Sequence, residues 1–182
     1  MAHSGIALLN PHLVFEKIDL RPGMRVADLG CGRTGHFVFP AASMVGEEGI
    51  VYAVDIVKNI LESIKSTASS QGYDNIQTTW SNIEMPGKVP IPENSLDSCF
   101  FVNVLSQIKE RQIAIKEATR LLKESGFLVI IDWGKKLGLL GPELGQEVNP
   151  SDFINMAKQA GLDLVEQGDM NEYLYLLIFK KI

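Results

Sequence analysis

Short runs of apolar residues recur along the chain, separated by segments in which apolar positions follow helical spacing. Continuous apolar runs of this length predict strands that are buried on both faces of a sheet. We expect five such strands, at Arg25–Leu29, Gly49–Val54, Ile76–Trp80, Leu96–Val102 and Phe127–Ile131. Since strands that alternate with helices form βαβ units, the pattern predicts a doubly wound, mostly parallel sheet with helices on both faces.

The segments between these strands carry apolar stripes that predict helices. One helix ends at Gly46, a second spans residues 57–71, and a third carries the stripe Ala114, Ala118, Leu121 and Leu122. A further helix, Asp152–Ala160, is followed by Gly161, a residue that commonly ends helices.

Two apolar runs near the C-terminus, Leu162–Glu166 and Tyr173–Phe179, flank the turn-forming sequence GDMNE. Strands joined by a short turn form a hairpin and pair antiparallel. The sequence therefore predicts an α/β fold whose seven-stranded sheet finishes with an antiparallel C-terminal hairpin. Tyr173 and Tyr175 in the last run are expected to pack in the core.

Bulk composition narrows the class of protein. A chain of 182 residues with 46% hydrophobic and 21% charged residues fits one soluble domain, with a leader at residues 1–20 and a core at residues 21–182. The net charge of −5 disfavours nucleic acid as a partner, because that role normally requires a basic patch. No apolar run approaches the roughly 18 residues of a membrane span. The start, MAHSGIALLN, lacks the features of a signal peptide, so we expect a cytoplasmic protein.

The cysteine and histidine content gives no sign of a disulfide or metal framework. Cys31 and Cys99 form no CxxC pair, and His3 and His12 do not have the spacing of metal ligands. We therefore expect no metal site.

A glycine-rich turn follows the first predicted strand and carries the strongest functional signal. Gly30, Gly32 and Gly35 form a GxGxxG pattern between a strand and a helix. Such glycines permit a tight turn and let a ligand approach the backbone at the start of the helix. Asp55, which lies 20 residues beyond Gly35 at the end of the second strand, can accept both hydrogen bonds of a ribose diol.

Asp28 helps to separate two ligands that such a turn can bind, a dinucleotide and S-adenosylmethionine. It lies two residues before Gly30, at the end of the first strand. An acidic group there suits the positively charged methionine end of S-adenosylmethionine and would repel a pyrophosphate. The residues therefore favour S-adenosylmethionine.

Four motifs occur in order along the chain: DLGCG, AVD, SLDSCFFVNVL and RLLKESGFLVIIDW. With the tail motif PSDFINMAKQAGL, this series resembles the class I S-adenosylmethionine-dependent methyltransferases. More narrowly, it is similar to the group that includes the quinone-biosynthesis C-methyltransferases and many small-molecule enzymes. The resemblance runs from about Gly23 to Lys180 and implies a Rossmann-like fold and a small-molecule acceptor.

The resemblance implies a binding role for particular residues. The turn from Gly30 to Gly35 and Asp28 would bind the methionine part, and Asp55 would bind the ribose. Ile56 would lie beside the adenine, with Asn82 and Ile83 at its rim. Asn103 would line the mouth of the pocket after the fourth strand.

Two positions depart from the family pattern. The family usually has its third glycine one residue earlier, so Thr34 lengthens the turn. The adenine position is usually aspartate, whereas Asn82 offers a neutral amide oxygen that can still accept a hydrogen bond.

Catalytic residues are not evident from the sequence. Cys31 is expected to be a small turn residue near the cofactor, with a nucleophilic role as the alternative. His36 could contact the cofactor carboxylate or the substrate, or could simply begin a helix. Trp133 either lines the pocket or packs in the core. Because the methyl group is already activated, the protein mainly has to align the reactants, and no general base is assigned.

Three alternatives to a small-molecule methyltransferase stay open. One is a module that binds S-adenosylmethionine without chemistry of its own. The others are an RNA or protein methyltransferase and an NAD(P)-dependent oxidoreductase. For the acceptor side, we predict that the leader and residues 134–150 fold over the pocket as a lid, the alternative being that the leader packs against the sheet.

Overall fold

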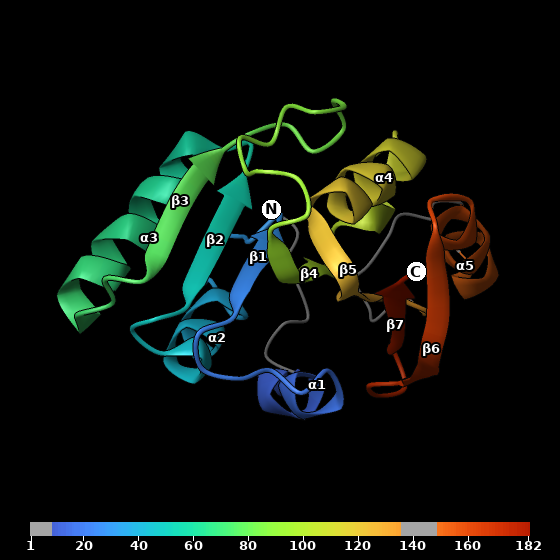
Figure 1. Ribbon diagram of the computed structural model, residues 1–182, viewed down its shortest axis with the longest axis horizontal. Coiled ribbons are helices and arrows are strands. Elements are labelled where there is room, and N and C mark those ends of the chain that lie inside the picture. The colour runs from blue at the N-terminus through green and yellow to red at the C-terminus, as the bar shows by residue number, and fades with distance from the viewer. Residues whose placement is uncertain (1–8, 136–148) are drawn as a thin grey trace.

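The computed structural model describes residues 9–135 and 149–182. Its centre is one sheet in which the strands follow the order β3-β2-β1-β4-β5-β7-β6 (Figure 1). The strands are β1 (Arg25–Leu29), β2 (Ile50–Asp55), β3 (Ile76–Trp80), β4 (Leu96–Val102), β5 (Leu122–Trp133), β6 (Leu162–Asp169) and β7 (Leu174–Lys181). The helices are α1 (Pro11–Lys17), α2 (Val38–Val45), α3 (Lys58–Gln71), α4 (Arg111–Leu121) and α5 (Pro150–Gln159), with a short 3-10 turn, η2 (Leu105–Gln107).

Strand directions confirm the predicted doubly wound sheet. β1 pairs in parallel with both β2 and β4, and the parallel set continues to β3 on one side and β5 on the other. β7 is antiparallel to both β5 and β6, as the predicted hairpin requires. The chain changes direction across the sheet between β1 and β4, and ligands of such sheets bind outside the carboxyl ends of the strands at this switch point.

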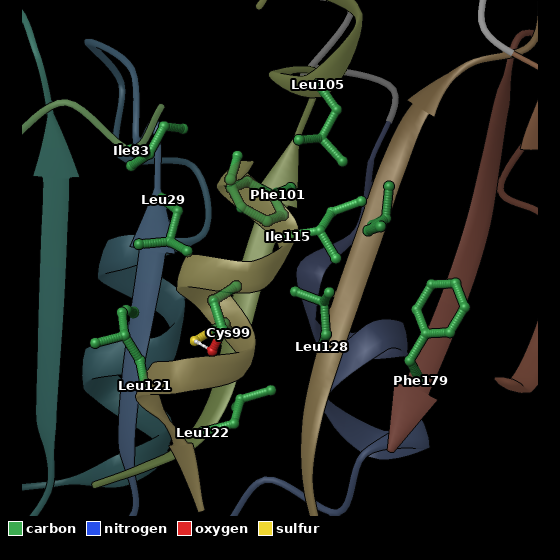
Figure 2. Packing of buried hydrophobic residues seen from close by; sticks show 14 of the residues in the cluster. Leu29, Ile83, Cys99, Phe101, Leu105, Ile115, Leu121, Leu122, Leu128 and Phe179 are labelled. Atoms are coloured by element: carbon green, nitrogen blue, oxygen red, sulfur yellow. Dashed lines mark hydrogen bonds between the residues drawn. The ribbon is translucent and has the colours of Figure 1, made fainter. Parts of the chain in front are cut away.

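Two apolar layers cover the two faces of the sheet. α4 and α5 contribute Ala114, Ile115 and Phe153 to one layer, and α1, α2 and α3 contribute to the other. Figure 2 shows the first layer, where side chains of α4 lie among those of β1, β4 and β5. Helices on both faces are the reason why most residues of β1 and β4, and residues 128–133 of β5, are buried.

The boundary of β5 differs from the sequence prediction. Leu122, predicted as part of a helical stripe, is the first residue of a longer strand and pairs with Leu96 of β4. A fully buried leucine satisfies either pattern, so periodicity alone could not separate the end of α4 from the start of β5. β2 likewise begins one residue later than predicted and includes Asp55.

The described part of the leader packs against the sheet. Phe15 of α1 is fully buried, and its ring centroid lies 5.7 Å from those of Phe37 and Phe100. The packing alternative therefore applies to α1. The predicted lid consists of residues 1–20 and 134–150, and its residues 1–8 and 136–148 lie outside the described residues, so the lid stays a prediction.

Among residues 9–135 and 149–182, no helix has the length and apolar character needed to cross a membrane.

Glu117 of α4 joins the connection between β3 and β4 to the helix layer. Its carboxylate is 3% exposed and accepts hydrogen bonds from Gly87 N at 2.8 Å and Val89 N at 3.1 Å. Arg120 completes the group with an Nη2–Oε1 distance of 2.7 Å. Burial opposes the charge on Glu117, but these donors outweigh it and lower its pKa.

We expect Glu117→Ala to lower the free energy of unfolding by about 3 kcal/mol, because it leaves two backbone N–H groups without an acceptor and removes the counter-charge of the partly buried Arg120 guanidinium, which keeps only its bonds to Val89 O and Ile91 O. Urea denaturation at pH 7 measures this change. Glu62→Ala, at an exposed position of α3, serves as the control and should stay within about 0.5 kcal/mol of the wild type. Equal effects of the two substitutions would contradict a structural role for Glu117.

Candidate functional site

The glycine turn after β1 is fixed to β2 by its backbone. Gly30 N and Cys31 N both donate to Val54 O, at 2.8 and 3.0 Å. All three glycines of the motif have positive φ, which explains their residue type. Their surroundings differ: an added Cβ would lie 2.6 Å from Val104 at Gly30 and 2.7 Å from Ile64 at Gly35.

Gly32 is the glycine that faces open space. Its φ is +64°, and an added Cβ would meet no heavy atom within 4 Å. Gly30 and Gly35 are therefore required by packing, whereas Gly32 leaves room in front of the turn for a ligand. The sequence motif alone treats the three positions alike.

Asp55 connects this turn to the next helix. It ends β2, is 8% exposed, and accepts hydrogen bonds from Gly32 N at 3.2 Å and from Val57 N at 2.9 Å. A carboxylate has about four lone-pair positions, so two remain for a diol. The ribose residue expected from the sequence thus also stabilises the turn itself.

Asp28 is an acidic residue buried at the end of β1. It is 3% exposed, and its Oδ1 has no hydrogen-bond partner among the described residues. Burial, and then the negative charge of Asp55, raise the pKa of Asp28 to about 7. A cation placed next to these two carboxylates would stabilise the ionised form of Asp28.

Two more buried polar side chains lie at the same edge of the sheet. Asn103 follows β4 with φ +56° and is 2% exposed, and neither atom of its amide has a partner in the described part of the chain. Ser81 follows β3 and is 4% exposed, and its Oγ also lacks a partner there. Its backbone N–H donates to Asp55 O at 3.1 Å, which places Ser81 beside the end of β2.

Sequence analysis did not identify Ser81 as a site residue and predicted that Asn82 lies at the adenine. The side-chain oxygen of Asn82 already accepts a hydrogen bond from Glu84 N at 2.9 Å, so it stabilises its own turn. Ser81 is the first residue after the strand and the more buried of the two. A polar residue directly at the end of a parallel strand was the signal available in the sequence.

The remaining predicted site residues lie in or next to the glycine turn, or at the ends of strands along the same edge of the sheet. Burial raises the pKa of the Cys31 thiol, which leaves it protonated and argues against the nucleophilic alternative. His36 Nε2 lies 2.8 Å from Leu9 O, so the ring connects the glycine turn to the leader. Ile56 is 52% exposed and Ile83 is 8% exposed, and both follow strands at the same edge. Trp133 is buried within the layer of α1, α2 and α3.

The strand order brings these groups together. β1, β2, β3 and β4 are parallel neighbours, so the residues at their carboxyl ends share one edge next to the switch point. Within the described ranges, no group of three or more histidine, cysteine, aspartate or glutamate side chains is placed to hold a metal ion. The edge combines buried acids, neutral polar groups and an open glycine, which suits a ligand with a cation, hydroxyl groups and a flat apolar part.

Residues 20–175 match the methyltransferase domain family. An aklanonic acid methyltransferase, DauC, from Streptomyces sp. (strain C5) is 40% identical over 75 residues, which are 41% of this chain and 32% of that protein. The ubiquinone/menaquinone biosynthesis C-methyltransferase UbiE of Shewanella piezotolerans is 30% identical over 171 residues, 93% of this chain and 65% of that protein. This chain therefore spans less than two thirds of the length of either curated relative.

The fold itself has close counterparts among solved structures. A SAM dependent methyltransferase from Aquifex aeolicus superposes with a TM-score of 0.86 at 24% identity, over 97% of this chain and 92% of that one. Together with the family match, this likeness confirms the fold class and the resemblance inferred from the ordered motifs.

We expect Asp28 to make the stability of the protein depend on pH. Because its pKa is raised to about 7 by folding, the folded protein retains a proton that the unfolded chain releases near its ordinary value of about 4. This contribution to stability is complete below pH 4 and is lost as the pH rises towards 7. Urea denaturation at pH 5 and pH 8 should therefore show a smaller fall in Asp28→Asn than in the wild type.

Asp163→Asn, at an exposed position of β6, is the control and should keep the wild-type difference between the two pH values. The assignment of the raised pKa fails if Asp28→Asn shows the same fall as this control.

Proposed function

This chain belongs to the methyltransferase domain family, and on that premise we propose that it transfers the methyl group of S-adenosylmethionine to a small-molecule acceptor. The observation that carries the proposal is Asp28, a buried carboxyl whose Oδ1 has no hydrogen-bond partner among residues 9–135 and 149–182, near the open glycine turn. S-adenosylmethionine has a positively charged methionine end, which supplies what this carboxyl lacks. A dinucleotide would bring a pyrophosphate next to Asp28 and Asp55, and like charges repel.

The residues at the sheet edge fit the three parts of this cofactor. Asp28, Gly32 and Asn103 would bind the methionine part, and Asp55 would accept from the ribose hydroxyls. Ser81 and the backbone around Asn82 would meet the polar edge of the adenine, with its ring against Ile56 and Ile83. These roles follow from unpartnered polar atoms and open space at this edge.

Methyl transfer requires little of the protein beyond correct placement of the two reactants. When bound, S-adenosylmethionine supplies a methyl group activated on a sulfonium. The fixed turn, held by Gly30 and Cys31 to β2 and by Asp55 to α3, would orient the cofactor without rearrangement on binding. Correct orientation of the reactants contributes on the order of 7–11 kcal/mol to such reactions. No general base is assigned.

The relatives support a small-molecule acceptor. UbiE is named for ubiquinone and menaquinone biosynthesis, and DauC for aklanonic acid. The net charge of −5 argues against RNA. Transfer to small molecules by the purified chain would decide against a module that only binds the cofactor. Transfer only to RNA or protein would replace the small-molecule proposal.

We expect Gly32→Val to weaken S-adenosylmethionine binding at least a hundredfold in calorimetry, because the added side chain would enter the open space before the turn. Gly72→Val is the matched control: Gly72 also has a positive φ, of +74°, with no atom within 4 Å of an added Cβ, but it ends α3 away from the site. Equal affinity of the two variants would remove the cofactor from this turn.

We expect Asp55→Ala to weaken S-adenosylmethionine binding about ten- to a hundredfold, because hydrogen bonds to a charged group contribute about 1.5–3 kcal/mol. Since Asp55 also accepts from Gly32 N and Val57 N, the variant should unfold at a lower urea concentration than the wild type. Calorimetry with NADH provides the comparison for the oxidoreductase alternative. Binding of NADH without binding of S-adenosylmethionine would overturn the proposed function.

A further inference from the structure

The connection between β3 and β4, residues 81–95, begins with a tight turn at residues 82–85 (Figure 1). Met85 N donates to Asn82 O at 3.2 Å, and the side-chain oxygen of Asn82 accepts from Glu84 N at 2.9 Å. Ile83, within the turn, is 8% exposed and packs in the layer of α4 and α5. The turn therefore carries Asn82 and Ile83, two of the residues that would lie at the adenine.

The side chain of Glu84 leaves this turn and reaches the start of α4. Its Oε1 accepts hydrogen bonds from Lys109 N and Glu110 N, both at 2.9 Å. These two donors lie on the far side of β4 in the sequence, and Glu84 itself is half-buried. One carboxylate oxygen thus joins the segment that follows β3 to the segment that follows β4.

The start of α4 depends on this carboxylate for a cap. Glu110 is the N-cap residue of α4, and its own side chain makes no capping hydrogen bond to the described residues. The N–H groups and the dipole at the start of a helix favour a negative charge there. Glu84 supplies that charge from a distant part of the chain, so the contact stabilises α4 and fixes the turn at the same time.

The segment between β4 and α4 begins with Asn103, a residue of the cofactor edge. Asn103 N donates to Ile131 O at 2.8 Å, which fixes the start of the segment to β5. The carbonyl of Asn103 accepts from Gln107 Nε2, and Arg111 Nε donates to Leu105 O at 2.8 Å. The segment is short and bonded within itself, so the position of the turn relative to α4 is also its position relative to Asn103.

A second glutamate, Glu117, fixes a later part of the same connection. It accepts from Gly87 N and Val89 N, neither of which belongs to the cofactor edge. Glu84 and Glu117 each accept from two backbone N–H groups, but only Glu84 lies in the turn that carries Asn82 and Ile83. The two residues therefore allow the effect of a stable connection to be separated from the effect of a correctly placed turn.

We propose that Glu84 is a positioning residue for the cofactor: it fixes Asn82 and Ile83 relative to Asn103 before S-adenosylmethionine binds. This inference rests on the proposed function and adds a residue that acts through its neighbours. Without the carboxylate, binding would have to order the turn, and the conformational entropy lost in that ordering would weaken the affinity. Sequence analysis assigned no role to Glu84, whose partners are distant in the sequence.

Calorimetry with S-adenosylmethionine tests the proposal on variants of the full chain. We expect Glu84→Ala to weaken binding about tenfold, the effect of one residue whose backbone has to be ordered on binding. Glu84→Gln should restore most of the affinity, because its amide oxygen can still accept from both N–H groups. Glu93→Ala, at an exposed position of the same connection, is the control and should bind like the wild type.

The outcomes of this titration separate the two proposals. Absence of binding by the wild type contradicts the proposed function. Wild-type affinity in Glu84→Ala, with normal binding by the wild type, contradicts only the role of Glu84. An equal loss of affinity in Glu84→Gln also overturns that role, because this variant keeps the acceptor.

Amide hydrogen exchange tests the same contact in the wild-type protein. Saturating S-adenosylmethionine should slow the exchange of Lys109 N and Glu110 N about tenfold or more, because openings that break their bonds to Glu84 also release the turn. Unchanged exchange at both groups would overturn the proposal.

Glu117→Ala distinguishes positioning from a general structural role. This variant should have a lower free energy of unfolding, yet its affinity for S-adenosylmethionine should fall less than that of Glu84→Ala. An equal loss of affinity in the two variants would show that any weakening of the connection has the same effect, and would overturn the positioning role of Glu84.

Discussion

Burial of the parallel strands on both faces is the constraint on which the other features depend. β1, β4 and β5 are covered by one helix layer on each side, so polar side chains within them would be buried without partners. Buried polar side chains therefore gather mainly at the ends of the strands. The carboxyl ends collect Asp28, Asp55, Ser81, Asn103 and Asp132, each less than 9% exposed, because parallel pairing brings these ends to one edge.

At this edge, the carboxylates of Asp28 and Asp55 interact electrostatically but differ in the hydrogen bonds that they accept. Asp55 accepts from two backbone N–H groups, whereas Asp28 has an oxygen without a partner in the described ranges. Holding two acids close together destabilises the ionised pair, and burial destabilises the charged form of Asp28 further, so folding favours its protonated form. A cation that approached these two acids would stabilise the ionised form of Asp28, whereas the negative charge of a phosphate would be repelled.

Much of the fold and part of the site could be predicted from the sequence. The strands from Arg25 to Ile131, the C-terminal hairpin and the glycine turn each leave a local signal, either a period of apolar residues or a fixed spacing of glycines. The roles of Gly30 and Gly32 could not be separated, since the difference depends on the side chain of Val104, which is distant in sequence. Tyr175 was predicted to lie in the core, as it does, but its position opposite Asp132 depends on the register between β5 and β7, which leaves no local signal.

The place of β7 in the sheet has a consequence for how the chain reaches its fold. β7 is the last strand in the sequence, yet it lies between β5 and β6 and fills both sheet faces with residues that are at most 4% exposed from Leu174 to Phe179. During synthesis, the apolar edge of β5 stays unpaired until Leu174–Lys181 has been made. Non-local pairing of this kind is slow, and an unpaired strand edge is where other chains can add. The nascent protein therefore passes through a stage in which protection of β5, by a chaperone or by rapid hairpin closure, decides between folding and aggregation.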